Sequence, residues 1–271
     1  MNIEIENLTF RYNPQVTALR EVSLSIKAGE AVAIFGENGA GKSTLAKHLN
    51  GLLKPNQGSV HIGGWDTRQR TPAELANRVS YTFQNPDDQL FEQTVAKEIS
   101  FGPRNLGLDN DQVHERVEQA MEMTGLSDQA ETHPYDLHAT ERKFVALAAG
   151  LAMRTPIVVI DEPTTGQDAR GQARLADILA HLKEDGRTLI TISHDIDFCA
   201  AHFERAVLMA NAQIIADRPM SDIFSDQDAL TRSAIEPPQM VQLARRLDLA
   251  ADPLTVEAFL EAYKPVNRDK D

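Results

Sequence analysis

The sequence predicts an α/β fold built around a mostly parallel β-sheet. Residues 30–35 form a short apolar run, a glycine-rich loop follows, and residues 44–49 begin a helical pattern. Two further apolar runs, at residues 157–160 and 189–192, are separated by an amphipathic helical pattern. Strands that alternate with helices pair in parallel, because the helix returns the chain to the same end of the sheet. An α/β core with parallel strands is therefore expected.

Two half-buried strands are expected before this core. Polar and apolar residues alternate over residues 3–10 and again over residues 22–26, so these strands should form an antiparallel edge of the core. Residues 71–74 (Thr-Pro-Ala-Glu) have the spacing of a helix capping box with proline at the first helical position. Residues 78–83 then form the next predicted strand.

A helical insertion and a helical C-terminal extension complete the predicted organisation. Between Thr94 and about Ala152 strand signals vanish, and one helical pattern ends at Gly125. After Ala216 short helices are expected, followed by a charged end that should fray. The expected division is a core of residues 1–93 and 153–217, a helical subdomain of residues 94–152 and an extension of residues 218–271.

The composition of the chain argues against several classes of partner and location. The net charge of −13 over 271 residues argues against nucleic acid or an anionic bilayer as the main partner. The longest apolar stretch is interrupted by Arg154 and Pro156, so no membrane span is expected. The single cysteine, Cys199, excludes an internal disulfide and is interpreted as a small buried hydrophobe in a protein of the reducing cytoplasm.

Residues 36–44, Gly-Glu-Asn-Gly-Ala-Gly-Lys-Ser-Thr, have the spacing of a P-loop that binds a nucleoside triphosphate. The glycines let backbone N–H groups face an anion, and the following helix adds its positive end. Lys42 is expected to reach the outer phosphates, and Ser43 to offer its hydroxyl to Mg²⁺. The residues expected to contact the nucleotide here are Gly36, Asn38, Gly39, Ala40, Gly41, Lys42, Ser43 and Thr44.

Two carboxylates follow the apolar strand at residues 157–160. Asp161 is expected in the Mg²⁺ shell, as in the second motif of P-loop nucleotidases, and Glu162 beside the γ-phosphate as the general base for the attacking water. A solvated strand end is the alternative interpretation. Four apolar residues before the pair, in a chain with a P-loop, favour the catalytic interpretation.

Four more side chains are candidates for the same site. Gln84 follows a predicted strand, where its amide can reach the metal or its water, and His194 follows another, where its imidazole can contact the γ-phosphate or the water. A lone histidine is more often structural. Tyr12 follows the first predicted strand and can stack on adenine, whereas Phe10 is interpreted as core. Asp168 belongs to a tight turn after Glu162 but could equally cap a helix.

Taken in order, these motifs resemble the ATP-binding subunit of an ABC transporter over roughly residues 1–230. Residues 83–91 and 161–168 are similar to the energy-coupling-factor type, which imports vitamins and transition-metal ions. Residues 238–247 and 254–259 resemble the C-terminal extension of that group. The resemblance implies a P-loop ABC ATPase core with an antiparallel β edge, an inserted all-α subdomain and a short helical extension.

One segment departs from the family pattern. The family signature is Leu-Ser-Gly-Gly-Gln, which closes over ATP held by the opposite subunit, whereas this signature segment reads Leu137-His138-Ala139-Thr140-Glu141. The serine hydroxyl and two glycines that allow close backbone approach are lost. The helix N-terminus and Thr140 can still contact ATP, so His138, Ala139, Thr140 and Glu141 are expected to cover that nucleotide while hydrolysis there becomes slow.

The resemblance implies an ATP-hydrolysing subunit that uses ATP and Mg²⁺ to power an importer from the cytoplasmic face of the membrane. Its implied partners are a second ATPase subunit, a transmembrane coupling protein and a substrate-binding membrane protein. A heterodimer is favoured over a homodimer, because a two-fold axis would place the altered signature at both sites. The loop after Gln84 is expected near the groove for the transmembrane partner. The alternatives are a soluble assembly or regulatory ATPase, and a nucleotide-gated subunit that hardly hydrolyses ATP.

Overall fold

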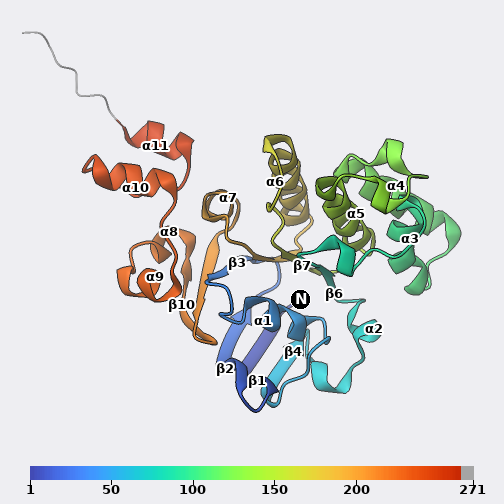
Figure 1. Ribbon diagram of the computed structural model, residues 1–271, viewed down its shortest axis with the longest axis horizontal. Helices are drawn as coiled ribbons and strands as arrows, with labels where there is room; N and C mark the ends of the chain where they lie inside the picture. Colours follow the sequence, from blue (N-terminus) through green and yellow to red (C-terminus); the bar gives the residue numbers. More distant parts are fainter. Residues whose placement is uncertain (264–271) are drawn as a thin grey trace, which may run out of the picture.

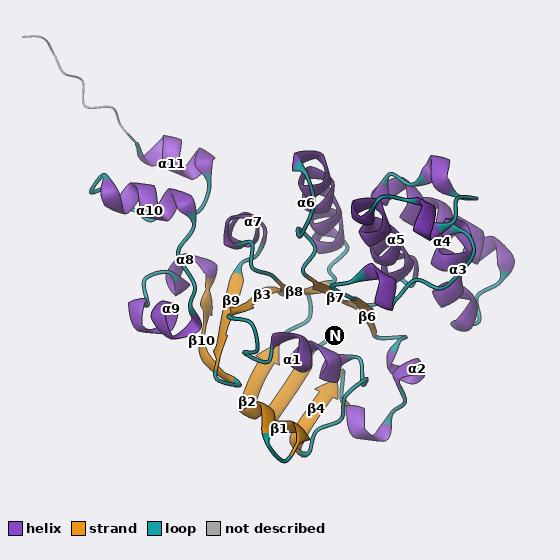
Figure 2. Ribbon diagram, viewed as in Figure 1, coloured by secondary structure: helices purple, strands orange, loops and turns teal. Residues whose placement is uncertain are grey.

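The computed structural model describes residues 1–263 and contains two sheets of different kinds (Figure 2). The larger sheet has six strands, and only the edge strand β10 runs antiparallel to its neighbour. In spatial order its strands are β10 (Gln213–Pro219), β9 (Arg205–Ala210), β3 (Ala31–Gly36), β8 (Thr188–Ile192), β7 (Ile157–Asp161) and β6 (Val79–Thr82). The smaller, antiparallel sheet has the order β2 (Val16–Ile26), β1 (Ile3–Asn13), β4 (Gln57–Ile62) and β5 (Trp65–Asp66).

The P-loop strand β3 separates two hydrophobic cores by its alternation. Ala31, Ala33 and Phe35 belong to one core, and Val32 and Ile34 to the other. Helices α6 (Ala169–Glu184) and α7 (Ile196–His202) cover the first face of the large sheet, and α1 (Lys42–Leu49) lies on the other side with the small sheet (Figure 1). Parallel strands buried on both faces read as continuous apolar runs, which is why β3, β7 and β8 were predictable.

The antiparallel part is larger than expected. The predicted edge becomes a separate four-stranded sheet, and both predicted strands are longer than their alternation indicated. The cause is irregular pairing between β1 and β2, where Asn7 and Glu21 adopt φ of 47° and 49° and interrupt the period of two. Strands β4, β5, β9 and β10 were not predicted from the sequence.

The middle of the chain, residues 94–152, contains helices and no strands in the part that the structure describes. The capping box at Thr71 and Glu74 is confirmed, as is the helix end at Gly125, which has φ 68°. The capping box begins α2 (Pro72–Leu75), and the α-helices between residues 94 and 152 are α3 (Val95–Asn105), α4 (Asn110–Thr124) and α5 (Ala139–Ala152). Helices α3 to α5 pack together beside β6 and β7 (Figure 1).

Four short helices form the described end of the chain, as expected from its pattern (Figure 1). They are α8 (Met220–Ile223), α9 (Gln227–Ser233), α10 (Gln239–Arg246) and α11 (Val256–Ala262). The charged end that is expected to fray lies outside the described residues. Cys199 is fully buried, as predicted. No helix among residues 1–263 has the length and apolarity needed to cross a bilayer. The three domain boundaries predicted from the sequence stay a prediction.

Candidate nucleotide site

The carboxyl ends of the parallel strands meet at one edge of the large sheet, and a cavity of about 300 Å³ opens there. This cavity brings together most of the side chains predicted from the sequence. They are Tyr12, Asn38, Gly39, Gly41, Lys42, Ser43, Thr44, Gln84, Asp161, Glu162 and His194. Of the P-loop residues expected to contact the nucleotide, Gly36 and Ala40 do not line it, because Gly36 ends β3 and Ala40 is buried.

The P-loop glycines satisfy steric demands that other residues would violate. Gly36 has φ 149°, and a Cβ there would lie 2.2 Å from the Met209 carbonyl oxygen. Gly41 has φ 104°, and a Cβ there would lie 2.4 Å from the Ala18 carbonyl oxygen. Glycine at both positions therefore lets the loop pack against β2 and β9 in a conformation that exposes backbone N–H groups.

Lys42 is held inside the P-loop. Its Nζ donates to the carbonyl oxygens of Gly36 and Glu37, at 2.7 and 3.0 Å, and the residue is only 6% exposed. Burial lowers the pKa of Lys42, and the nearby charges of Glu162 and Asp161 oppose that shift. The loop thus keeps a cation beside two carboxylates, in the cavity where a polyphosphate would carry the opposing negative charge.

Asp161 ends β7 and has one oxygen in use and one free of partners. The Tyr81 hydroxyl donates to Oδ2 at 2.8 Å, whereas the buried Oδ1 has no hydrogen-bond partner among the described residues. Burial raises the pKa of Tyr81, with a further contribution from Asp161, so this hydroxyl remains a donor. A buried carboxylate oxygen without a donor is the kind of ligand that a hard cation binds.

Glu162 is buried in the site and held by several contacts. It is 5% exposed and adopts φ 52°, a left-handed conformation that is uncommon outside glycine. Its Oε2 accepts from the His194 N–H and the Thr165 hydroxyl, both at 3.3 Å, and His194 Nε2 lies 3.4 Å from Oε1. Burial raises the pKa of Glu162, and His194 opposes the shift. A carboxylate with a raised pKa, aimed into the cavity, suits general-base chemistry.

The loop that carries Gln84 is tied to the helical part of the chain by a residue to which no role was assigned from the sequence. The side chain of Gln89 accepts from the Phe83 N–H at 3.2 Å and donates to the Ala146 carbonyl oxygen at 2.9 Å. It therefore joins the end of β6 to α5. Gln89 lies in a segment already noted for its family resemblance, but a contact 57 residues away has no local sequence signal.

Tyr12 belongs to β1, which ends at Asn13, and not to the loop after the strand as predicted. The irregular pairing that lengthens β1 explains the difference. The ring lines the cavity, is 55% exposed and packs edge-on against Phe10 at 5.0 Å, and its hydroxyl lies 3.2 Å from Thr44 Oγ1. Phe10 is buried, as predicted. Tyr12 thus contributes an aromatic ring to the cavity wall and contacts the P-loop helix.

Replacing Tyr12 with alanine is expected to weaken ATP binding by about 1 kcal/mol, or about fivefold in Kd, because one aromatic stacking contact is lost. Tyr12→Phe keeps the ring and removes the hydroxyl next to Thr44, so it should bind ATP nearly as the parent does. Equilibrium titration with ATP measures both variants. Parental affinity in Tyr12→Ala would show that the ring does not contact the base.

The signature segment and Asp168 lie outside this cavity. His138 and Ala139 are exposed at the start of α5, and the carboxylate of Glu141 accepts from the His138 N–H at 3.0 Å. Asp168 caps α6, since its Oδ1 accepts from the Gly171 N–H at 2.8 Å. The helix-cap interpretation of Asp168 is therefore the one that its contacts support, and contact with ATP stays a prediction for all of these residues.

Four cavity residues were missed from the sequence: Val16, Thr17, Ala18 and Ile192. Ile192 ends β8, whereas the other three begin β2, where Val16 pairs with Asn13 across a tight turn. The dipeptide Asn13-Pro14 is a turn signal, and a hairpin placed there would have brought residues 16–18 next to Tyr12.

A parallel sheet with a P-loop after β3, and an aspartate–glutamate pair at the end of β7, two strands away, defines a P-loop nucleoside triphosphatase. The family model for ABC transporters matches residues 19–165, so the chain belongs to the ABC transporter family of ATP-binding proteins. The predicted class and activity, an ATP-binding ATPase of this family, are confirmed.

Individual relatives agree with this assignment. The protein named energy-coupling factor transporter ATP-binding protein EcfA from Methanothermobacter thermautotrophicus is 39% identical over 261 residues, 96% of this chain and 84% of the relative. The structure of cbiO1 from Clostridium perfringens, described as part of the ABC transporter complex cbiONQ, matches with a TM-score of 0.75 at 28% identity, covering 91% of this chain and 98% of that one. A dimeric post-hydrolysis structure of the ATP-binding cassette MJ0796, with ADP and Pi, matches with a TM-score of 0.74 at 25% identity, covering 80% and 98%.

Proposed function

We propose that this chain is one ATP-hydrolysing subunit of an energy-coupling-factor importer for a vitamin or transition-metal ion. It would act at the cytoplasmic face of the membrane with a second, different ATPase subunit, a transmembrane coupling protein and a substrate-binding membrane protein. The observation that carries the proposal is the single cavity in which Lys42, Asp161, Glu162 and His194 meet, in a chain whose relatives are named as energy-coupling-factor and CbiO subunits.

In this proposal the P-loop residues bind the phosphates of ATP, and Tyr12 stacks on adenine. Glu162 orients the attacking water and accepts its proton, and the contacts from His194 and Thr165 keep the carboxylate in the cavity. His194 is then positioned to contact the γ-phosphate or the water. Preorganised charges of this kind account for much of the catalysis in phosphoryl transfer.

The same cavity fits Mg²⁺. The buried Oδ1 of Asp161, which has no hydrogen-bond partner within residues 1–263, and the hydroxyl of Ser43 are oxygen ligands of the type that this cation prefers, and Gln84 lines the cavity with them. When bound, Mg²⁺ neutralises charge on the phosphates. Because Tyr81 holds the second oxygen of Asp161, the carboxylate is oriented by the protein itself.

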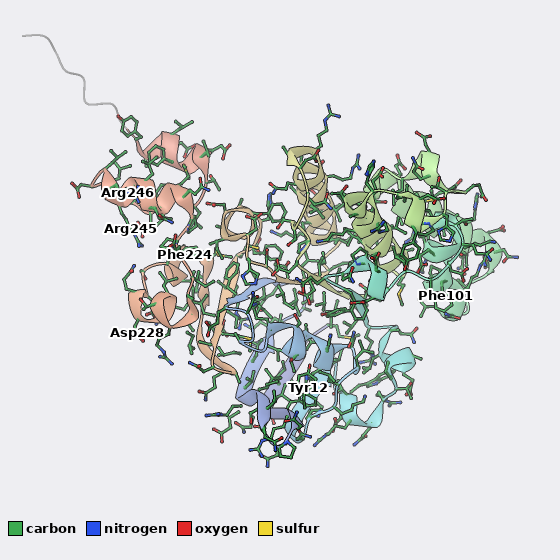
Figure 3. The ribbon with its side chains drawn as sticks, viewed as in Figure 1. Tyr12, Phe101, Phe224, Asp228, Arg245 and Arg246 are labelled. Atoms are coloured by element: carbon green, nitrogen blue, oxygen red, sulfur yellow. The ribbon has the colours of Figure 1, made fainter. Side chains whose placement is uncertain are left out.

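An apolar groove of about 690 Å³ supports the proposed transmembrane partner. It includes Phe101 of α3 (labelled in Figure 3), Leu52 from the connection after α1, and the residues that directly follow β6, α3 and α5, which are Phe83, Leu106 and Met153. Phe101 is 44% exposed, so part of its ring is left for a partner to cover. We propose that an apolar helix of the transmembrane coupling protein binds in this groove.

The groove and the nucleotide cavity are connected through adjacent residues. Phe83 lines the groove, and Gln84 lines the cavity. Movement of a helix in the groove therefore displaces the segment that presents Gln84 to the nucleotide. This arrangement supports coupling between ATP and the membrane partner, typically worth about 1–3 kcal/mol per effector.

Replacing Phe101 with glutamate is expected to abolish co-purification of the chain with its detergent-extracted membrane partners, because a charge would be buried in the groove. ATP binding by the isolated chain should not change, since Phe101 does not line the nucleotide cavity. Leu260→Glu is the matched control, because Leu260 is 64% exposed on α11 and lies outside the groove. If the parent chain co-purifies with no membrane protein, the alternative of a soluble assembly or regulatory ATPase is favoured instead.

A further inference from the structure

Three hydrogen bonds join helix α5 to residues 162–167. The ammonium group of Lys143 donates to the carbonyl oxygens of Glu162 and Thr165, at 3.2 and 2.8 Å. The side-chain amide of Gln167 donates to the Thr140 carbonyl oxygen at 3.1 Å, so the contacts run in both directions. Lys143 and Gln167 lie next to Asp161 and Glu162 along one small cavity wall. The catalytic segment is thus attached to the first two turns of α5.

Lys143 donates to the main chain of a residue that has an unusual backbone conformation. Glu162 has φ 52°, and a residue other than glycine keeps such a strained conformation only where its surroundings enforce it. The main chain on either side of that torsion is fixed by two bonds: the Glu162 N–H donates to the Ile192 carbonyl oxygen at 2.8 Å, and the Glu162 carbonyl oxygen accepts from Lys143. Lys143 provides the charged one of these two bonds.

We propose that Lys143 is a positioning residue for the general base: its ammonium holds the main chain of residues 162–165 in the conformation that presents the Glu162 carboxylate to the nucleotide cavity. This inference rests on the proposed ATP hydrolysis at the same site. Lys143 does not line the cavity, so it acts through Glu162 and not on the nucleotide itself.

The charge of Lys143 also matters for the two acids. Burial lowers the pKa of Lys143, and Glu162 and Asp161 oppose that shift, so the three groups interact electrostatically. A cation behind two adjacent carboxylates reduces the repulsion between them. A neutral side chain of the same length at this position would lose both the hydrogen bonds and this compensation.

The hydrogen bond from Lys143 to Glu162 connects α5 to the general base. The helix begins at the signature segment, and Lys143 follows Glu141 by two residues. A partner subunit that presses on His138 or Ala139 would move the same helix turn that holds the Glu162 carbonyl. Contacts at the signature segment would thereby affect the position of the Glu162 carboxylate in this chain's own cavity. This effect would not involve the loop that carries Gln84.

Lys143→Met is expected to lower kcat for ATP hydrolysis by the purified complex about 10- to 100-fold, the usual effect of misplacing a catalytic group, with little change in KM for ATP. Lys143→Arg keeps a cationic donor and should recover most of the rate. Lys183→Met is the matched control, because Lys183 is a partly buried lysine that pairs with Glu204 at 2.7 Å, away from the site. It should behave as the parent does.

A second measurement does not depend on turnover. Hydrogen exchange of the amides in residues 164–167 should be faster in the Lys143→Met chain than in the parent or Lys183→Met chains. Lys143→Gln, which keeps one short donor, provides a milder variant should the methionine chain fail to fold, and its exchange should be intermediate. Unchanged exchange together with unchanged kcat would overturn the proposal for Lys143. A parent complex without ATP turnover would instead overturn the proposed function, while the exchange result would still decide whether Lys143 holds the segment.

Discussion

Replacing Glu162 with glutamine is expected to abolish ATP turnover at this chain's P-loop while ATP binding remains intact. Glutamine keeps the size of the side chain but cannot accept the proton of the attacking water, and the loss of a general base typically costs about 10²–10⁴-fold in rate. Lys42 and Tyr12 are untouched, so the nucleotide should still bind and hold the dimer closed. Steady-state hydrolysis and equilibrium ATP binding on the same variant test both parts.

Two control variants distinguish the loss of the catalytic base from a loss of ATP binding and from the removal of a carboxylate charge elsewhere. Lys42→Ala should weaken ATP binding itself, because it removes the cation that the loop holds beside the phosphates. Glu115→Gln is a matched change outside the site, at a carboxylate that pairs with Arg154 on the surface, and it should hydrolyse ATP like the parent. Parental turnover by Glu162→Gln, in a complex whose other site is disabled, would contradict the assignment of the base.

The parts of the site that could be predicted from the sequence are those with local signals. The P-loop spacing, the apolar run before Asp161 and Glu162, and the strand before His194 are each contained in a few consecutive residues. Because carboxyl ends of parallel strands meet at one edge, the parallel sheet alone brings these groups together. The helical segment was predictable for the same reason, since its period is local.

What could not be predicted depends on contacts between distant segments. The short strand β5 has only two residues, and the irregular pairing of β1 with β2 conceals the alternation that marks a strand. The bonds from Gln89 to α5 and from Lys143 to Glu162 span 57 and 19 residues. Neither a glutamine nor a lysine predicts, by its residue type alone, a hydrogen bond to so distant a segment. The left-handed conformation of Glu162 also has no sequence signal, since glutamate rarely adopts it.

The structure shows a hydrogen bond within the altered signature segment that was not predicted from the residue types. The carboxylate of Glu141 turns back to the His138 N–H, so one of the free backbone donors at the start of α5 is already satisfied within the chain. The Cβ atoms of Ala139 and Thr140 stand where the family has glycines. A phosphate brought to this helix end would meet a carboxylate in place of an open set of donors.

The second ATPase subunit's equivalent of Glu162 is therefore expected to be largely dispensable, whereas Glu162→Gln should remove most of the turnover of the complex. In the proposed heterodimer each nucleotide would lie between one subunit's P-loop and the other's signature segment, so the altered residues His138 to Glu141 would affect only the ATP bound by the partner. ATPase rates of the reconstituted complex, with each acid changed in turn to glutamine, measure the difference.

A restored signature segment makes this prediction sharper. Changing His138, Ala139, Thr140 and Glu141 to Ser, Gly, Gly and Gln should raise the turnover that survives in a complex carrying Glu162→Gln, because the partner's ATP would then be covered by open backbone donors. Asp128→Asn, at an exposed position of the same helical segment, is the control for an altered surface charge. Equal losses on changing either acid, or full activity in a complex that contains only this chain, would show that Ala139 and Thr140 serve as well as glycines and that the two sites are equivalent.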